Sequence, residues 1–253
     1  MDQPGDRRWS PARLAALCVA VVAAGACAVA PLPGGEQGEP NQPAAPGAEP
    51  TRADGEDLLE GTDTVEEFEQ DIEGAERLAD QYWSQRFAGF GAEFQPIGRT
   101  IPYYRDGEVS CGDQLIPRNN AVYCLAGGTE FIAYDANWAF TVFQAVGDSF
   151  LFYLIGHEYA HGIQVRLELD YSFSIQRELA ADCLAGAYLG DSVRDGALRL
   201  DDGDLEEFRL GLEAVADDPN QPWFEEGSHG TADQRIAAFF RGYDGSLAGC
   251  DLS

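Results

Sequence analysis

Hydrophobic and polar positions divide this chain of 253 residues into three stretches. A run of small apolar residues extends from Leu14 to Ala30, and a polar stretch rich in Pro, Gly and Glu follows it. From Val65 onward, apolar residues recur first at helical spacing, then in short extended runs, and then at helical spacing again. This order predicts one α+β domain over residues 62–253, mostly helical with a small antiparallel or mixed sheet.

The first helix of the domain is predicted to begin at Thr64. Thr64 and Glu67 fit a capping box, in which each side chain bonds the backbone N–H of the other residue. Apolar residues then follow at helical spacing, namely Val65, Phe68, Ile72, Ala75, Ala79, Tyr82 and Trp83. The acidic residues between them are interpreted as the solvated face of this helix.

Three short extended runs, separated by turn residues, are predicted to be strands. They cover Ile97–Tyr104, Ala121–Cys124 and Glu130–Tyr134. The last of them comes shortly before the most apolar helix of the chain. We therefore expect Phe131–Tyr134 to be an exposed sheet edge that pairs with an extended peptide.

The rest of the chain is predicted to be helical, because its apolar residues recur at helical spacing between turn residues. The expected helices cover Asn137–Gln144, Asp148 to about Leu167, Ile175–Leu189, Asp204–Ala216 and Thr231–Gly242. Asp148, Ser174 and Thr231 are the expected N-cap residues. The almost continuous apolar content of the second of these helices predicts burial on most of its sides.

This buried helix carries the motif H-E-x-x-H, formed by His157, Glu158 and His161. Histidines four residues apart leave the same face of a helix, where two neutral imidazoles can bind one Zn²⁺. A carboxylate next to the first histidine can take a proton from a metal-bound water. The alternative is a helix with two hydrogen-bonded core histidines. We favour zinc, because two of the three histidines in the chain lie in this motif.

A catalytic zinc site needs a third protein ligand and an open position for water. Glu178 lies in the first turns of the next helix, where it can fold back against the two histidines. Asp182, one turn later, can accept a hydrogen bond from a ligand histidine and fix its tautomer. Glu168 and Asp170 are rival ligands that reach the metal less easily. Cys183 would close the site as a fourth ligand, but its position points to a different face.

Three segments together resemble the bacterial putative neutral zinc metallopeptidase family. They are H-E-Y-A-H-G-I-Q at 157–164, E-L-A-A-D-C-L-A-G at 178–186 and S-H-G-T-A-D-Q-R at 228–235. The last two segments are more specific than H-E-x-x-H, which many unrelated zinc peptidases share. The resemblance extends from about residue 66 to residue 250.

This resemblance implies a zincin-like fold and a catalytic zinc ion. It implies that His157, His161 and Glu178 are the zinc ligands and that Glu158 is the catalytic base. The expected activity is that of a secreted or membrane-tethered endopeptidase that hydrolyses peptides or proteins with a zinc-bound water. The alternative function is a non-catalytic cell-envelope lipoprotein with a structural zinc site. The presence of Glu158 argues against it, because a structural site has no use for that carboxylate.

The N-terminal residues are typical of an export signal. Arginines precede the apolar run, so residues 1–30 are predicted to be a signal peptide or a lipoprotein signal. The sequence Ala24-Gly25-Ala26-Cys27 fits either cleavage after its third residue or a relaxed lipobox in which Cys27 is lipidated. Residues 31–61 are predicted to be a disordered tether. We therefore expect an extracellular or cell-envelope protein that reaches the membrane only through this signal or a lipid anchor.

Export favours disulfide bonds among the cysteines of the domain. Cys111 and Cys124 bracket a turn region and are expected to pair, and Cys250 can pair with Cys183 and tie the C-terminus to the ligand helix. The net charge of −28 argues against nucleic acid or an anionic membrane surface as a partner.

His229 is the third histidine and lies just before the last predicted helix. Peptide hydrolysis passes through an oxyanion that needs a donor besides zinc, and a loop imidazole can provide it. His229 is therefore a candidate catalytic residue, and Tyr171, between the two ligand helices, is a competing donor. The alternative for His229 is a structural role at the entrance of the helix.

Overall fold

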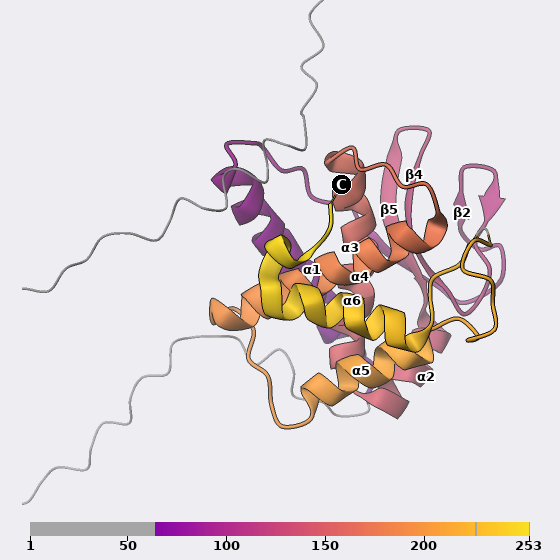
Figure 1. The fold of residues 1–253 in the computed structure, drawn as a ribbon. Coiled ribbons are helices and arrows are strands. Elements are labelled where there is room, and N and C mark those ends of the chain that lie inside the picture. Colours follow the sequence, from indigo (N-terminus) through magenta and orange to yellow (C-terminus); the bar gives the residue numbers. More distant parts are fainter. Residues whose placement is uncertain (1–63, 226, 253) are drawn as a thin grey trace, which may run out of the picture. The chain divides into compact units, whose positions relative to one another are not determined.

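The computed structural model describes residues 64–225 and 227–252, which are drawn in colour in Figure 1. The predicted signal at 1–30, the tether at 31–61 and the lipidation candidate Cys27 lie outside the described residues. Among the helices that the structure describes, none has the length and apolar content needed to span a membrane.

The described chain contains six α-helices, five strands and a short 3₁₀ helix, an α+β fold as predicted. The helices are α1 Val65–Gly89, α2 Ala136–Val146, α3 Ser149–Arg166, α4 Ser174–Arg194, α5 Asp204–Ala214, α6 Ala232–Gly245 and the 3₁₀ helix Ser246–Gly249. The strands are β1 Thr100–Tyr103, β2 Ser110–Cys111, β3 Gln114–Leu115, β4 Ala121–Ala126 and β5 Thr129–Asp135.

The helix ends show which of the predicted N-caps form in the structure. Thr64 and Glu67 form the predicted capping box of α1. Thr231 holds the N-cap position of α6, and its N–H donates to Gln234 Oε1 at 3.0 Å. The prediction for Ser174 is wrong, because Phe173 holds the N-cap position and the Ser174 hydroxyl accepts from the Gly227 N–H instead.

A small mixed sheet has the strand order β1-β5-β4. β5 pairs with β1 in parallel, with Thr100 opposite Ile132, and with β4 antiparallel, with Tyr123 opposite Ile132. The prediction that Phe131–Tyr134 is a sheet edge is therefore wrong, since β5 is bonded on both sides. Chain order alone does not reveal that β1 pairs with the outer side of β5. The edge nearest to α3 is β4.

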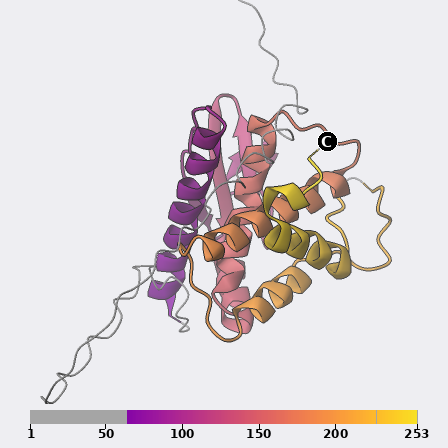
Figure 2. The same cartoon turned by 60° about the vertical axis from the view of Figure 1, so that its left-hand side comes forward.

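Helix α3 is the centre of the fold, packed by α1, α4, α5 and the sheet, and Figure 2 shows it enclosed between these elements. Every residue from Ser149 to Ala160 is buried. This confirms the burial on most sides that its apolar content predicts. A helix so enclosed cannot move without disturbing the core, so side chains on it are held at fixed positions.

Helices α4 and α6 touch backbone to backbone. A Cβ placed on Gly186 would lie 2.0 Å from the carbonyl oxygen of Phe239, and one on Gly242 would lie 1.9 Å from that of Cys183. Real Cβ atoms do not come so close, so this crossing needs glycine. The close approach brings the first turns of α6 against α4, where the predicted ligand Glu178 is located.

Both predicted disulfides are confirmed. Cys111–Cys124 joins β2 to β4, with a Cα–Cα distance of 5.6 Å. Cys183–Cys250 joins the middle of α4 to the C-terminal segment, with a Cα–Cα distance of 5.7 Å. Cys183 is therefore not a metal ligand. One disulfide holds the edge strand, and the other ties the C-terminal segment to α4.

The glycine crossing generates a matched pair of substitutions on α6. We predict that Gly242→Ala destabilises the protein by about 3 kcal/mol or more, because the added methyl group would overlap backbone atoms of α4. The cost of this overlap exceeds the gain in helix propensity that alanine brings. Gly245→Ala is the control, since a Cβ there meets nothing within 4 Å. Its unfolding free energy should change by less than about 1 kcal/mol. Chemical denaturation measures both, and equal stabilities would contradict the packing described.

Candidate active site

A cavity of about 750 Å³ lies between α3, α4, strand β4 and the loops before α4 and α6. It is lined by every residue to which the sequence assigns a catalytic or ligand role, namely His157, Glu158, His161, Glu178, His229 and Tyr171. The rival carboxylates Glu168 and Asp170 are exposed and are not part of this lining.

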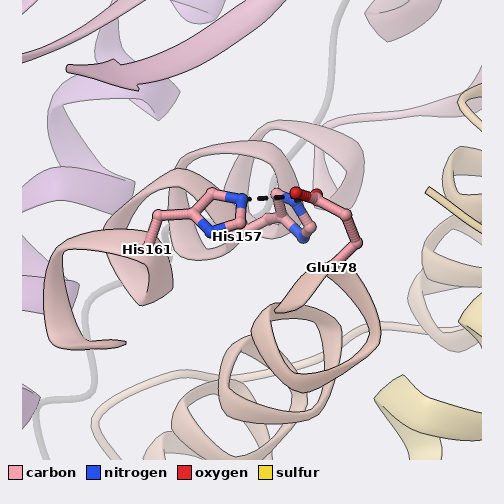
Figure 3. A group of neighbouring side chains, drawn as sticks. All are labelled: His157, His161 and Glu178. Carbon is pink, nitrogen blue, oxygen red and sulfur yellow. Dashed lines mark hydrogen bonds and ion pairs between the residues drawn. The ribbon is translucent and has the colours of Figure 1, made fainter. Parts of the chain in front are cut away.

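The three predicted ligands meet at one point (Figure 3). Glu178 Oε2 lies 3.2 Å from His157 Nε2 and 3.3 Å from His161 Nε2. In a tetrahedral zinc site with bonds of about 2.0–2.1 Å, neighbouring ligand atoms are about 3.3 Å apart. The burial of Glu178 raises the pKa of its carboxyl group, but the two imidazoles beside it hold that pKa well below its usual range. The donor set and its spacing therefore fit Zn²⁺.

A buried charged network holds His157. Its Nδ1 lies 2.8 Å from Asp182 Oδ1, which also accepts a hydrogen bond from the Tyr153 hydroxyl at 2.9 Å. Arg235 donates to both oxygens of Asp182, each at 2.9 Å, and is 3% exposed. Burial alone would raise the pKa of Asp182, but the charges of Arg235 and His157 outweigh it and lower that pKa to about 2. Asp182 therefore stays ionised and accepts the His157 N–H, which leaves Nε2 free to bind a metal.

The other two ligands have supports of their own. His161 Nδ1 lies 2.9 Å from Gln164 Oε1, and the Gln164 amide donates to the Arg177 carbonyl at 2.7 Å. The Arg177 side chain in turn donates to Glu178 Oε1 at 3.0 Å. Each ligand is thus oriented by a partner on the side away from the metal position.

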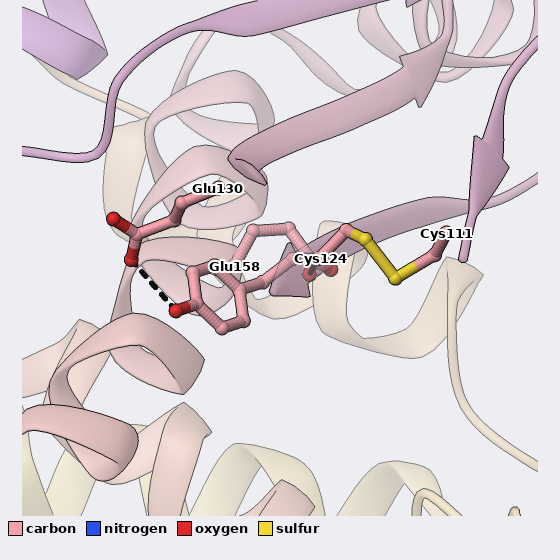
Figure 4. Close-up of a disulfide and its surroundings, with 5 residues drawn as sticks. Cys111, Cys124, Glu130 and Glu158 are labelled. Carbon is pink, nitrogen blue, oxygen red and sulfur yellow. Dashed lines mark hydrogen bonds between the residues drawn. A yellow bond between two sulfur atoms is a disulfide. The ribbon is translucent and has the colours of Figure 1, made fainter. Parts of the chain in front are cut away.

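Glu158 faces the sheet edge. Its Oε2 accepts the backbone N–H of Tyr123, on β4, at 2.6 Å. The Tyr123 hydroxyl donates to Glu130 at 2.7 Å, and Arg166 at the end of α3 donates to both oxygens of Glu130. Figure 4 shows Glu130, Glu158 and the Cys111–Cys124 disulfide grouped along this strand. The strand edge and the carboxylate of Glu158 are therefore held together.

His229 is half-exposed at the cavity, and Asp217 anchors it. Asp217 Oδ2 accepts the backbone N–H groups of His229 and Gly230 at 2.6 and 2.8 Å, and its Oδ1 lies 3.3 Å from His229 Nδ1. The Tyr171 hydroxyl is buried and has no hydrogen-bond partner among the residues described. Burial raises its pKa to about 12, so it remains a donor at neutral pH.

The supporting residues Arg235, Tyr153, Gln164 and Arg177 do not appear among the predicted site residues. Gln164 could be found from spacing, because it lies three residues after His161 on the same helix. Arg235 lies within the segment S-H-G-T-A-D-Q-R that carries the family resemblance, but its partner is on another helix. Local patterns do not reveal such a pairing.

Comparison with known proteins agrees with this site. The model of the family described as "Putative neutral zinc metallopeptidase" matches residues 12–252. The chain is 30% identical over 195 residues to the "Uncharacterized protein YpfJ" of Escherichia coli K12, and equally to the protein of that name in E. coli O6:H1. The aligned region is 67% of this chain and 66% of the relatives, so the chain spans about two thirds of their length.

No solved structure matches the chain. The family match nevertheless covers nearly the whole chain and includes every residue of the cavity described above. The protein therefore belongs to the putative neutral zinc metallopeptidase family.

Proposed function

We propose that this protein is a zinc-dependent endopeptidase with a zincin-like catalytic domain. The observation that carries the proposal is the position of Glu158, which shares one cavity with His157, His161 and Glu178, whose ligand atoms lie close together. A purely structural metal site has no need of such a carboxylate, and it uses four protein ligands instead of three.

The proposed mechanism assigns a task to each residue. His157, His161 and Glu178 would hold Zn²⁺, which when bound lowers the pKa of water and polarises a carbonyl group. Glu158 accepts the proton of the attacking water and then delivers it to the leaving amine. Asp182 and Gln164 keep the imidazoles in the tautomers that expose Nε2 to the metal position.

The free edge of β4 supports the choice of an extended peptide or protein as substrate. β4 is bonded to β5 on one side only, and its residues Ala121 to Tyr123 line the cavity. A substrate strand can pair with such an edge through its main chain, as in other forms of β-augmentation. The Tyr123 N–H donates a hydrogen bond to Glu158, so the proposed catalytic carboxylate lies beside this edge.

We further propose that the protein works outside the cytoplasm, in the cell envelope or beyond it. The signal-like residues 1–30 support this location, with Cys27 as the candidate lipid anchor. The two disulfide bonds of the domain support it as well, since such bonds persist in oxidising compartments.

The central test compares two glutamate substitutions. Glu158→Gln should retain about one Zn²⁺ per chain and lower peptide hydrolysis by several orders of magnitude, because the base is lost and the ligands remain. Glu178→Ala should lose zinc as well as activity. Exposed Glu168 provides the control, and Glu168→Gln should change neither. Metal analysis and cleavage of a peptide library measure the outcomes. Wild-type activity in Glu158→Gln would remove it as the base.

A second test concerns the oxyanion donor. His229→Ala should keep zinc and thermal stability, while kcat/KM falls by about 10²–10³, the usual cost of one lost donor. Tyr171→Phe is the comparison, because it removes only a hydroxyl group. If Tyr171→Phe shows the loss and His229→Ala does not, the donor is Tyr171 and His229 is structural.

A further inference from the structure

A second group of carboxylates lies away from the zinc ligands, where α5 packs against α3. It consists of Asp148, directly before α3, with Asp204 and Glu207 in the first turn of α5. One oxygen from each of the three lies within 4.8 Å of the others. Asp148 and Asp204 are 4% and 5% exposed. Like charges so close and so buried repel one another strongly unless a cation or a proton separates them.

Asp148 does not cap the helix that it precedes. Asp148 holds the N-cap position of α3 but makes no side-chain cap bond, contrary to its expected role. The Ser149 N–H is instead accepted by Glu207 Oε2 at 3.3 Å, from α5. Asp148 Oδ2 and the hydroxyl of fully buried Ser149 have no hydrogen-bond partner in the described part of the chain. Buried polar atoms in folded proteins normally have a partner, and at this place a bound ion or a water can be that partner.

Protein cations do not neutralise the cluster. No arginine in residues 64–225 or 227–252 forms an ion pair with Asp148, Asp204 or Glu207. Asp71 of α1 adds a further negative charge. Burial, followed by the charges of Glu207, Asp71 and Asp204, raises the pKa of Asp148 to about 7. At neutral pH the free carboxylates therefore compete between sharing a proton and binding a cation.

The backbone at Gly147 leaves room for the Glu207 side chain. Gly147, the residue before Asp148, has φ +128°, and a Cβ there would lie 2.0 Å from the Glu207 carboxylate carbon. A side chain at 147 would thus push Glu207 out of the group. Glycine serves two needs at this position, a backbone conformation that other residues avoid and room for the carboxylate.

We propose that Asp148, Asp204 and Glu207 bind a calcium ion that joins α5 to the start of the zinc-motif helix α3. Carboxylates are the ligands of hard cations, and Ca²⁺ accepts oxygens in flexible geometry at about 2.3–2.6 Å. Mg²⁺ demands near-ideal octahedral geometry and gives up its waters reluctantly, so groups made of protein carboxylates favour Ca²⁺. The far end of α5 continues into Ala214–Ala216, which line the catalytic cavity. Calcium at this place stabilises the scaffold of the site and takes no part in the chemistry.

The test is calcium-dependent stability of the zinc-loaded, full-length chain. In buffer stripped of calcium, addition of 10 mM CaCl₂ should raise the wild-type melting temperature by about 3–6 °C, and MgCl₂ should raise it less. Glu207→Gln and Asp204→Asn should lose this calcium-specific shift. Without calcium they should be at least as stable as the wild type, because a like charge is gone. Glu206→Gln, on the same turn but exposed and paired with Arg209, should respond like the wild type.

Equal calcium shifts in all four proteins would overturn the proposal and assign the effect to screening of the net charge of −28. A larger shift with Mg²⁺ would also overturn it. If the two site variants do not fold, calorimetric titration of the wild type with CaCl₂ decides. Binding of one Ca²⁺ per chain supports the site, and absence of binding refutes it. Zinc content is measured in parallel, so failure of the proposed peptidase activity leaves this test unaffected.

Discussion

The ion pair between Asp182 and Arg235 is the interaction on which the candidate site depends. Both side chains are almost completely buried, so neither charge could be accommodated without the other. Asp182 receives the guanidinium from α6 on one side and the His157 ring from α3 on the other. The orientation of the His157 ring therefore depends on how α4 and α6 pack against each other.

This pair lies between the same two helices as the glycine-mediated contact. The backbones of α4 and α6 touch at Gly186 and Gly242, and Arg235 of α6 donates two hydrogen bonds to Asp182 of α4. The Cys183–Cys250 disulfide ties the C-terminal segment to α4 next to Asp182. Packing of small residues between α4 and α6 thus supports the position of His157, one of the predicted metal ligands. The buried carboxylates of Glu158, Glu178 and Asp182 outnumber the buried guanidinium of Arg235, and this excess of acidic groups favours the binding of a cation.

Much of the site follows from local sequence. Spacing within one helix places His157 and His161 on one face, and the next helix brings Glu178 to them. The capping box at Thr64 and both disulfides were also predictable. Non-local pairing was not. Chain order suggested that β5 is the edge strand, whereas β1 covers its outer side and leaves β4 free. The acidic group around Asp148 combines separate segments, each of which has the appearance of an ordinary helix start.

We infer that a buried network, remote from solvent, prepares His157 for zinc. The most direct measurement is the zinc dissociation constant, obtained by competition with a chelator, for the wild type and for Asp182→Asn. Asp191→Asn is the matched control, since Asp191 is also buried on α4 and bonded by Tyr82 and Arg86, but on the far side from the ligands. We predict that Asp182→Asn alone binds zinc about 10–100-fold more weakly, the usual cost of losing such a partner. Equal zinc affinity in all three folded proteins would contradict it.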